Sequence, residues 1–218
     1  SISSGNDNPW EYGFLGSSLT LQEPASFPYL YGTDLSGEYP PNQDGYLISP
    51  NYTIPDAGAT LHFEKWGCMD TYAYSYDGAQ LQYRVNQGTW QPFQPSTTGW
   101  YDGTRISTSF NNPWGTTEVW IDGDCGLNEM TVREAPLDQW AGDQMQFRFR
   151  FVSDTYNYGS GPFDGFYVDN FGILIPNYSS NGSWTSGGVD LSNQSSFNMG
   201  YVDVDAEIPV ETRVLISI

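Results

Sequence analysis

The chain has 218 residues, of which 26 are acidic and 7 are basic, and its formal net charge is −19. A chain of this length forms one large domain, or one domain with part of another. The negative charge argues against nucleic acid and anionic membranes as partners, because a phosphate-bearing partner needs a basic protein face.

The composition favours an all-β fold. The chain contains 16 Tyr, 12 Phe and 8 Trp, residues that suit the half-buried surface of a sheet. Gly and Pro are scattered along it, as the turns of such a fold require. No stretch has a capped helical period or approaches the ~20 apolar residues of a membrane span. No signal peptide is present, so we expect the numbering to begin after one was removed.

Turn-forming residues dominate the N-terminal part of the chain. Residues 1–20 are polar and rich in Gly and Ser, and residues 31–41 are predicted to form a loop. Strands are then predicted at Tyr46–Ser49, Thr60–Trp66, Gln80–Val85, Glu118–Ile121, Met145–Val152 and Gly165–Ile175. About seven strands separated by long loops are typical of a two-sheet β-sandwich.

The clearest strand, Met145–Val152, alternates apolar and polar residues without error. Such alternation indicates a half-buried strand of an antiparallel sheet. The side chains expected to point inward are Met145, Phe147, Phe149 and Phe151, and by the same argument Leu61, Phe63, Leu81, Tyr83 and Val85. Trp66 and Trp120 share strands with core residues, and we expect both rings to point to the opposite face.

The C-terminal part of the chain has a different character. Residues 177–183 are predicted to be a linker that follows a sandwich module at residues 1–176. Residues 184–218 contain two strand candidates but are too few for a core of their own. They either add strands to the same sandwich or begin a second β module.

Two features indicate a secreted or cell-surface protein. Cys68 and Cys125 are predicted to form a disulfide that closes a loop of roughly 58 residues, although free thiols remain an alternative. A zinc site is disfavoured because it needs four ligands. Four Asn-x-Ser/Thr sequons, at Asn51, Asn177, Asn181 and Asn193, are compatible with surface glycosylation.

Six segments carry a resemblance to a known family, and together they cover about residues 10–175. They are Tyr31–Tyr39, Tyr46–Pro50, Leu61–Trp66, Tyr76–Tyr83, Phe147–Asp154 and Gly165–Asn170. In these segments the chain resembles the non-catalytic, MAM-like jelly-roll modules of secreted bacterial and archaeal proteins, including those attached to immune inhibitor A-type metallopeptidases. The resemblance implies an antiparallel, concanavalin-like β-sandwich that binds or spaces, often with bound calcium and without proteolytic activity.

A structural calcium site is expected where acidic residues meet the ends of two strands. Calcium takes six to eight oxygen ligands, and carboxylates beside Gly-rich turns supply them. The candidate ligands are Asp154, Asp164 and Asp169, with Asp34 and Glu38, and also Asp44, from the early loop. A salt bridge from Asp169 to Arg148 or Arg150, or a solvent-facing position, is the alternative. Asp122-Gly123-Asp124 is interpreted as a plain turn.

Exposed tryptophans are the candidate ligand-binding residues, because sugars stack on flat rings. The candidates are Trp90, Trp100, Trp114 and Trp140, with packing against the sandwich as the alternative for each. Catalysis is not expected: His62 is the only histidine, no nucleophile motif is present, and no recognised glycosidase motif surrounds the clustered acids.

The sequence therefore favours a non-catalytic extracellular binding or adhesion module, stabilised by calcium, that recognises a glycan or a protein. The expected partners are that ligand and other modules of the same parent chain. A structural spacer or self-associating subunit of a surface assembly is the alternative, and a glycoside-active enzyme is a weaker one.

Overall fold

In a computed structural model, the chain divides into two compact units, Ser1–Asn177 and Tyr178–Ile218. The residues that the structure describes are 2–3, 8–16, 21, 29–55, 58–70, 77–103, 117–121, 124–155 and 164–175, all in the first unit. The predicted linker at 177–183, the predicted strands or module at 184–218, and three of the sequons, Asn177, Asn181 and Asn193, lie outside the described residues.

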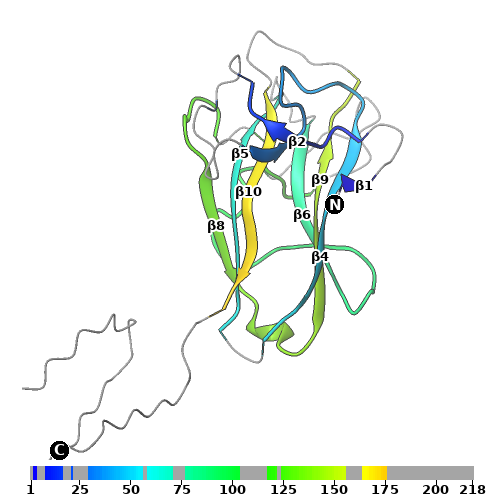
Figure 1. Ribbon diagram of the computed structural model, residues 1–218, viewed down its shortest axis with the longest axis vertical. Helices are drawn as coiled ribbons and strands as arrows, with labels where there is room; N and C mark the ends of the chain where they lie inside the picture. The colour runs from blue at the N-terminus through cyan, green and yellow to red at the C-terminus, as the bar shows by residue number, and fades with distance from the viewer. Residues whose placement is uncertain are drawn as a thin grey trace, which may run out of the picture. The chain divides into compact units, whose positions relative to one another are not determined.

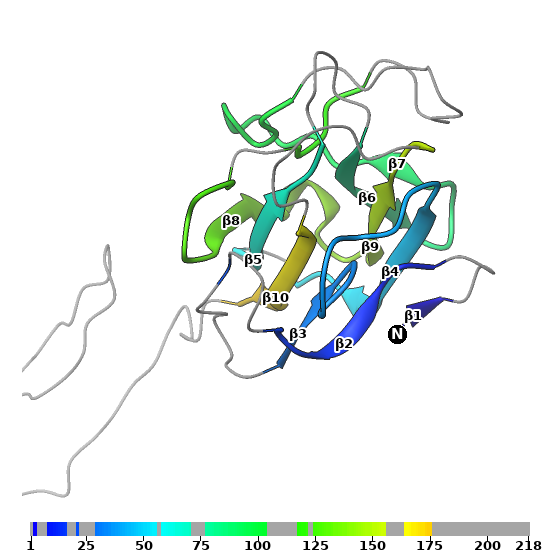
Figure 2. The same ribbon diagram turned by 90° about the horizontal axis from the view of Figure 1, so that it is seen from above.

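The described part is a sandwich of two five-stranded antiparallel sheets, so the predicted all-β sandwich is confirmed (Figure 1). Sheet A contains, in spatial order, β1 (Ile2–Ser3), β4 (Asp44–Thr53), β9 (Gln144–Val152), β6 (Gly78–Val85) and β7 (Gln91–Pro92). Sheet B contains β2 (Glu11–Phe14), β3 (Tyr29–Gly32), β10 (Gly165–Leu174), β5 (Thr60–Cys68) and β8 (Thr131–Pro136). Figure 2 shows the two sheets as separate layers. The edge of sheet B formed by β2 and β3 lies beside the edge of sheet A formed by β1 and β4.

The main core lies between the sheets, and β9 supplies its centre. Met145, Phe147, Phe149 and Phe151 are each at most 3% exposed, so the predicted inward face is confirmed. Leu61, Phe63 and Leu81 are also buried, while Tyr83 and Val85 are half-buried and pack against the same cluster. Phe63 of sheet B meets Phe149 of sheet A edge-on with ring centroids 5.1 Å apart, a favoured aromatic geometry that ties the layers together.

A second, smaller core covers the outer face of sheet B. Trp66 points to this face, as predicted, but it is fully buried there and its ring lies 5.6 Å from that of Tyr167. The other members of the cluster are Leu21, Leu30, Leu35, Cys68 and Met130. Because loop residues supply several of these side chains, sheet B has apolar packing on both faces.

The prediction for Trp120 is wrong. Trp120 belongs to the main core and stacks on Phe166 at 5.5 Å, whereas Val119 and Ile121 form a separate small cluster. Alternation places successive side chains on opposite faces but does not say which face is the core. The larger ring occupies the interior here, since burying it removes more apolar surface from water. The expected strand at 118–121 makes only isolated bridges, from Trp120 to Ala79 and from Val119 to Gly103.

The strands β2 and β3 of sheet B were not predicted from the sequence. The segment 1–20 contains β2, and β3 ends inside the predicted loop at 31–41. Both strands have four residues, and each includes a glycine, which weakens the strand pattern in the sequence. They matter for function because they form one wall of the candidate site.

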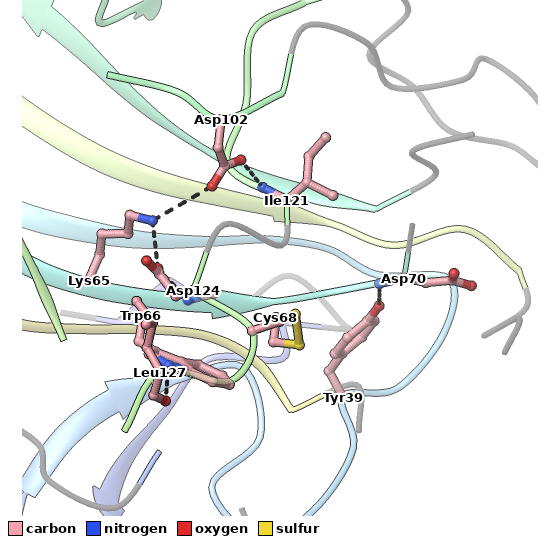
Figure 3. Close-up of a disulfide and its surroundings, with 11 residues drawn as sticks. Tyr39, Lys65, Trp66, Cys68, Asp70, Asp102, Ile121, Asp124 and Leu127 are labelled. Carbon is pink, nitrogen blue, oxygen red and sulfur yellow. Dashed lines mark hydrogen bonds and ion pairs between the residues drawn. A yellow bond between two sulfur atoms is a disulfide. The ribbon is translucent and has the colours of Figure 1, made fainter. Parts of the chain in front are cut away.

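The disulfide between Cys68 and Cys125 is present, with Cα atoms 4.8 Å apart and a sequence separation of 57, so this prediction is confirmed. Beside it, Lys65 Nζ lies 2.6 Å from Asp124 Oδ2 and 3.8 Å from Asp102 Oδ2 (Figure 3). Asp124 also accepts a hydrogen bond from the backbone N of Gly67 at 2.9 Å. The disulfide and the buried ion pair together hold the loop after Asp124 against β5.

Candidate functional site

Two β-bulges face the same space between the sheets. In sheet A the pairing of β4 with β9 shifts register between Ile48 and Asn51, and in sheet B the pairing of β10 with β5 shifts between Asp169 and Gly172. Residues from both bulges line one groove with a volume of about 380 Å³. Bulges recur beside binding and active sites, where they redirect side chains. Asn170 inside the second bulge has φ 47°, a left-handed conformation that Asn tolerates better than most residues.

Aromatic side chains are prominent in the groove wall. We call this site the aromatic groove and define it by Tyr12, Tyr29, Tyr31, Tyr52 and Phe171, with Asp169 and Asn170 at the β10 bulge. The rings come from four different strands, β2, β3, β4 and β10. The site therefore exists only once both sheets have formed.

Three of the rings, those of Tyr12, Tyr29 and Tyr31, form a continuous row that extends to Phe14. Antiparallel pairing places Tyr12 opposite Tyr31 and Phe14 opposite Tyr29, so all four rings share one face of sheet B. Tyr12 lies 4.7 Å from Tyr31 and 5.8 Å from Tyr29, and Phe14 lies 4.3 Å from Tyr29, measured between centroids. Tyr12 is 58% exposed, Tyr29 41% and Phe14 60%. This row offers a ligand flat apolar faces beside water.

The polar groups at the groove are held by local hydrogen bonds. Asp169 Oδ1 accepts from the backbone N of Asn170 at 2.8 Å, and Asn170 Nδ2 donates to Glu64 Oε1 at 3.1 Å. On the opposite wall, Ser49 Oγ accepts from the backbone N of Phe147 at 3.0 Å and donates to the carbonyl oxygen of Pro50 at 2.7 Å. These bonds fix both bulges, so the groove is formed before a ligand arrives.

The acids predicted to bind calcium are divided between different parts of the sandwich. Asp164 and Asp169 belong to the same strand region, and five residues of strand separate them by about 16 Å. Their side chains therefore cannot serve one ion. Asp169 lines the aromatic groove, while Asp164 precedes β10. The alternative pairing of Asp169 with Arg148 or Arg150 is also not found, because both arginines lie on β9 of sheet A and Arg150 pairs with Asp44 at 2.7 Å.

Asp34 and Asp164 do lie close together, on either side of the Tyr167 hydroxyl. That hydroxyl is 3.0 Å from the carbonyl oxygen of Asp34 and 2.7 Å from that of Asp164. Burial, and then the charges of Asp164, Asp34 and Glu11, raise the pKa of Tyr167. The Asp34 carboxylate accepts bonds from the backbone N and hydroxyl of Ser36 at 2.8 and 2.9 Å, so it caps its own turn. Glu38 is exposed.

Asp154 belongs to a buried group of acids around Tyr39. Its backbone N donates to Asp77 Oδ1 at 2.7 Å, and the Tyr39 hydroxyl donates to Asp77 Oδ2 at 2.6 Å. The backbone N of Asp70 in turn donates to the Tyr39 hydroxyl at 2.9 Å (Figure 3). Burial, reinforced by the charges of Asp154 and Asp70, raises the pKa of Asp77 to about 7. A Cβ at Gly165 would lie 3.4 Å from the Tyr39 ring, so this group sits beside the start of β10.

Within the described residues, no group of three or more His, Cys, Asp or Glu side chains has an arrangement that could hold a metal ion. The calcium hypothesis therefore stays a prediction.

The tryptophans proposed as ligand-binding residues have different environments. Trp100 is only 4% exposed and packs in the main core, so its ring cannot meet a ligand. Trp140 is half-buried against Tyr83 at 5.0 Å. Trp90 is half-buried and lies beside two arginines, while Trp114 lies outside the described residues. The exposed aromatic row is therefore built from Tyr and Phe rather than from these tryptophans.

His62 pairs with a carboxylate at the surface of sheet B. Its Nδ1 lies 2.9 Å from Glu134 Oε1, and the two residues are opposite each other in the pairing of β5 with β8. No serine or cysteine nucleophile is joined to this pair by any hydrogen bond in the described part of the chain. Asn51, the one sequon asparagine among the described residues, is exposed on β4.

The groove residues were missed because their signal in the sequence is short. Glu11-Tyr12-Gly13-Phe14 and Tyr29-Leu30-Tyr31-Gly32 each alternate aromatic residues with others over only four positions. This spacing puts the rings of each strand on one face. The pairing of the two strands, which brings the rings together, leaves no mark in a single sequence.

Comparison with known proteins gives one partial match. No protein-family model matches the chain. The chain is similar to Bacillopeptidase F of Bacillus subtilis (strain 168), with 28% identity over 121 residues, which is 50% of this chain. The match spans only 8% of the length of that peptidase. Such a small share is compatible with a module that accompanies a peptidase domain. The described residues include no helix long and apolar enough to cross a membrane.

Proposed function

We propose that this sandwich is a non-catalytic binding module of an exported protein and that it holds a glycan chain in the aromatic groove. The disulfide supports an oxidising, extracytoplasmic location, because such bonds persist mainly there. The similarity to 8% of a peptidase supports a role as an accessory part of a larger chain. Any catalytic activity of that larger chain would then reside in another domain.

The observation that carries the proposal is the pair of facing bulges with exposed rings between them. Tyr12 and Tyr29 keep large parts of their rings in water, although burial of such rings stabilises a fold. The groove also carries a carboxylate and an amide at the β10 bulge, in Asp169 and Asn170. Flat apolar faces beside fixed hydrogen-bonding groups match the faces and hydroxyls of a sugar ring.

The alternative of a structural spacer requires no exposed aromatic row. Rings that pack internally, as those of Trp66 and Trp120 do, are sufficient to stabilise a spacer. Self-association through β2, an edge strand of sheet B, would cover Tyr12 and Phe14 and is a distinct outcome of the test below.

Affinity electrophoresis in gels that contain soluble xylan, mannan or mixed-linkage glucan tests the proposal. We expect at least one polysaccharide to retard the protein, and the double variant Tyr12→Ala/Tyr29→Ala to lose most of that retardation. Two stacking contacts of ~0.5–1.5 kcal/mol each sum to ~1–3 kcal/mol, which corresponds to a loss of about fivefold to 150-fold in affinity.

Val132→Ala is the matched control. Val132 is 51% exposed on β8, at the other edge of sheet B, so its truncation removes exposed apolar surface away from the groove. Retardation that is equal in both variants would contradict a groove site. A wild-type dimer that the tyrosine variant converts to a monomer, without retardation by any polysaccharide, would favour self-association instead.

A further inference from the structure

Arginines are gathered on the outer face of sheet A, although the chain is strongly acidic. Arg148 and Arg150 alternate along β9 with the buried Phe147 and Phe149, so they point away from the core. Arg84 of β6 lies on the same face, opposite Gln146 of β9. Three of the four arginines in the described part of the chain therefore share one sheet face.

Two aromatic rings separate these arginines. The Arg148 guanidinium lies 4.1 Å from the ring centroid of Tyr46 and 4.4 Å from that of Trp90. The Arg84 guanidinium lies 4.8 Å from the ring centroid of Trp90, and that of Arg150 lies 5.6 Å from the ring centroid of Tyr46. We call the series Arg84, Trp90, Arg148, Tyr46 and Arg150 the arginine row. Stacking on rings holds each guanidinium in one orientation.

Neutral amides, rather than carboxylates, fix two of the three arginines. Arg84 Nε and Nη2 both donate to Gln146 Oε1, at 2.9 and 2.6 Å. Arg148 Nε donates to Gln82 Oε1 at 2.7 Å. Among the described residues, no carboxylate lies within 4.0 Å of Arg84 or Arg148, whereas Arg150 has Asp44.

The buried amides behind Arg148 extend this support. Gln82 is 7% exposed and donates through Nε2 to Gln80 Oε1 at 2.9 Å. Gln80, 2% exposed, donates to the carbonyl oxygen of Glu118 at 2.9 Å. This chain of bonds orients the Gln82 oxygen toward Nε of Arg148. The terminal nitrogens of the Arg148 guanidinium are then available to a ligand. Arg148 is thus preorganised without being neutralised.

We propose that Arg84 and Arg148 bind the carboxylate or sulfate groups of an acidic polysaccharide laid across the outer face of sheet A. A guanidinium presents a planar fork that matches either anion with two hydrogen bonds. This site is separate from the aromatic groove and does not depend on it. The acids elsewhere on the chain slow the approach of a polyanion, but at physiological salt charges separated by more than about 8 Å are largely screened.

A glycan fits this face better than an acidic peptide. An extended peptide gains most from backbone hydrogen bonds at a sheet edge, and the strands that carry the row, β6 and β9, already have neighbours on both sides. The middle of a sheet face, with fixed guanidiniums and aromatic rings, instead offers side-chain contacts alone. Those contacts suit the charged groups and ring faces of a sugar chain.

Isothermal titration with polygalacturonate, and with its methyl-esterified form, tests the charge requirement. We expect binding to polygalacturonate that weakens as salt is raised, and little binding to the ester. Dextran sulfate and uncharged dextran form the second pair, and the tighter charged polymer identifies the anion as carboxylate or sulfate. Equal binding of charged and uncharged polymers would overturn the proposal, as would tighter binding of polyglutamate than of either acidic polysaccharide.

Two substitutions locate the site. Arg148→Gln is expected to weaken binding about tenfold or more, since it removes charge-assisted hydrogen bonds, and Arg148→Lys is expected to recover only part of the loss. Arg133→Gln, on β8 of sheet B, is the matched control and should bind as the wild type does. An equal loss of affinity in Arg133→Gln would show that binding depends only on net charge, and it would contradict a site at Arg148.

The double variant Tyr12→Ala/Tyr29→Ala separates this proposal from the groove. It should keep its affinity for the acidic polymer while it loses retardation by neutral polysaccharides. Loss of acidic-polymer binding in that variant, with Arg148→Gln unaffected, would place the anion in the groove and contradict a site on sheet A.

Discussion

Single residues in this sandwich stabilise buried charge in two different ways. Asp124 is paired with Lys65, the only lysine of the chain, and Lys65 is 1% exposed. In the described part of the chain no cation pairs with Asp77, which instead accepts hydrogen bonds from the Tyr39 hydroxyl and the backbone N of Asp154. The two carboxylates should therefore respond differently to substitution and to pH.

Asp77 should make the folded protein less stable as pH rises. Its pKa is 3.8 in the absence of structure and about 7 in the folded protein, where burial outweighs the hydrogen bonds that it accepts. Between these values the folded state binds more protons than the unfolded state, so the free energy of unfolding falls with rising pH. We expect Asp77→Asn to become more stable relative to the wild type as pH rises through this window. Thermal melting of both proteins across the window measures this difference.

The exposed acid Glu38 supplies the control for that titration. Glu38→Gln removes an exposed carboxylate of the same formal charge, so Asp77→Asn should differ from the wild type by more than Glu38→Gln does. Parallel curves for Asp77→Asn and the wild type would show that Asp77 titrates at the same pH in the folded and unfolded states.

Removing Lys65 should leave an uncompensated charge in the interior. Lys65→Met is expected to lower the free energy of unfolding by about 3–5 kcal/mol, because Asp124 then has no cation. The double variant Lys65→Met/Asp124→Asn should recover part of this loss, since the buried charge is gone. Urea unfolding measures both values. A double variant that is less stable than the single variant would contradict this explanation.

At the scale of elements, the bulge of β10 shapes the aromatic groove. Asn170 adopts φ 47° there, a left-handed conformation that Asn tolerates and that a β-branched residue rarely adopts. Asn170→Val is therefore expected to cost about 1–2 kcal/mol in urea unfolding, while Asn170→Gly should cost little. Equal stability of the Val and Gly variants would mean that the bulge does not require this conformation.

The long strands could be predicted from the sequence, and the short ones could not. Alternation over eight residues located β9 and its inward face, and the other strand-like runs located β4, β5, β6 and β10 to within a few residues at each end. The strands β2 and β3 have four residues each and contain glycine, so local preference barely distinguishes them from loops. The position of β3 is set by pairing with β10, which lies far away in the sequence, and β2 in turn pairs with β3.

The candidate site was predicted less well for the same reason. Exposure of Trp100 depends on what covers it, and a single sequence does not contain that information. Trp120 was assigned to the wrong face because alternation shows which side chains share a face but not which face lies in the core. The disulfide was predictable, because two cysteines in a chain with the composition of a secreted protein usually form a disulfide.

At the scale of the whole sandwich, calcium is a prediction that concerns the end with the buried acids. Asp154 and Asp164 are 1% and 3% exposed, and both lie near the start of β10. An ion bound there would stabilise the folded state by mass action. We expect millimolar calcium to raise the melting temperature relative to EDTA, and Asp154→Asn to abolish the rise. Glu118→Gln, an exposed acid near β6, should retain it.

Glycan binding in the aromatic groove can be located by mapping backbone amide NMR shifts during titration with a neutral oligosaccharide. The oligosaccharide is taken from the polysaccharide that retards the protein in electrophoresis. We predict that the largest shifts fall at Tyr12, Tyr29, Tyr52 and Asn170, around both bulges. Shifts that avoid these residues and cluster on another part of the sandwich would contradict glycan binding in the groove.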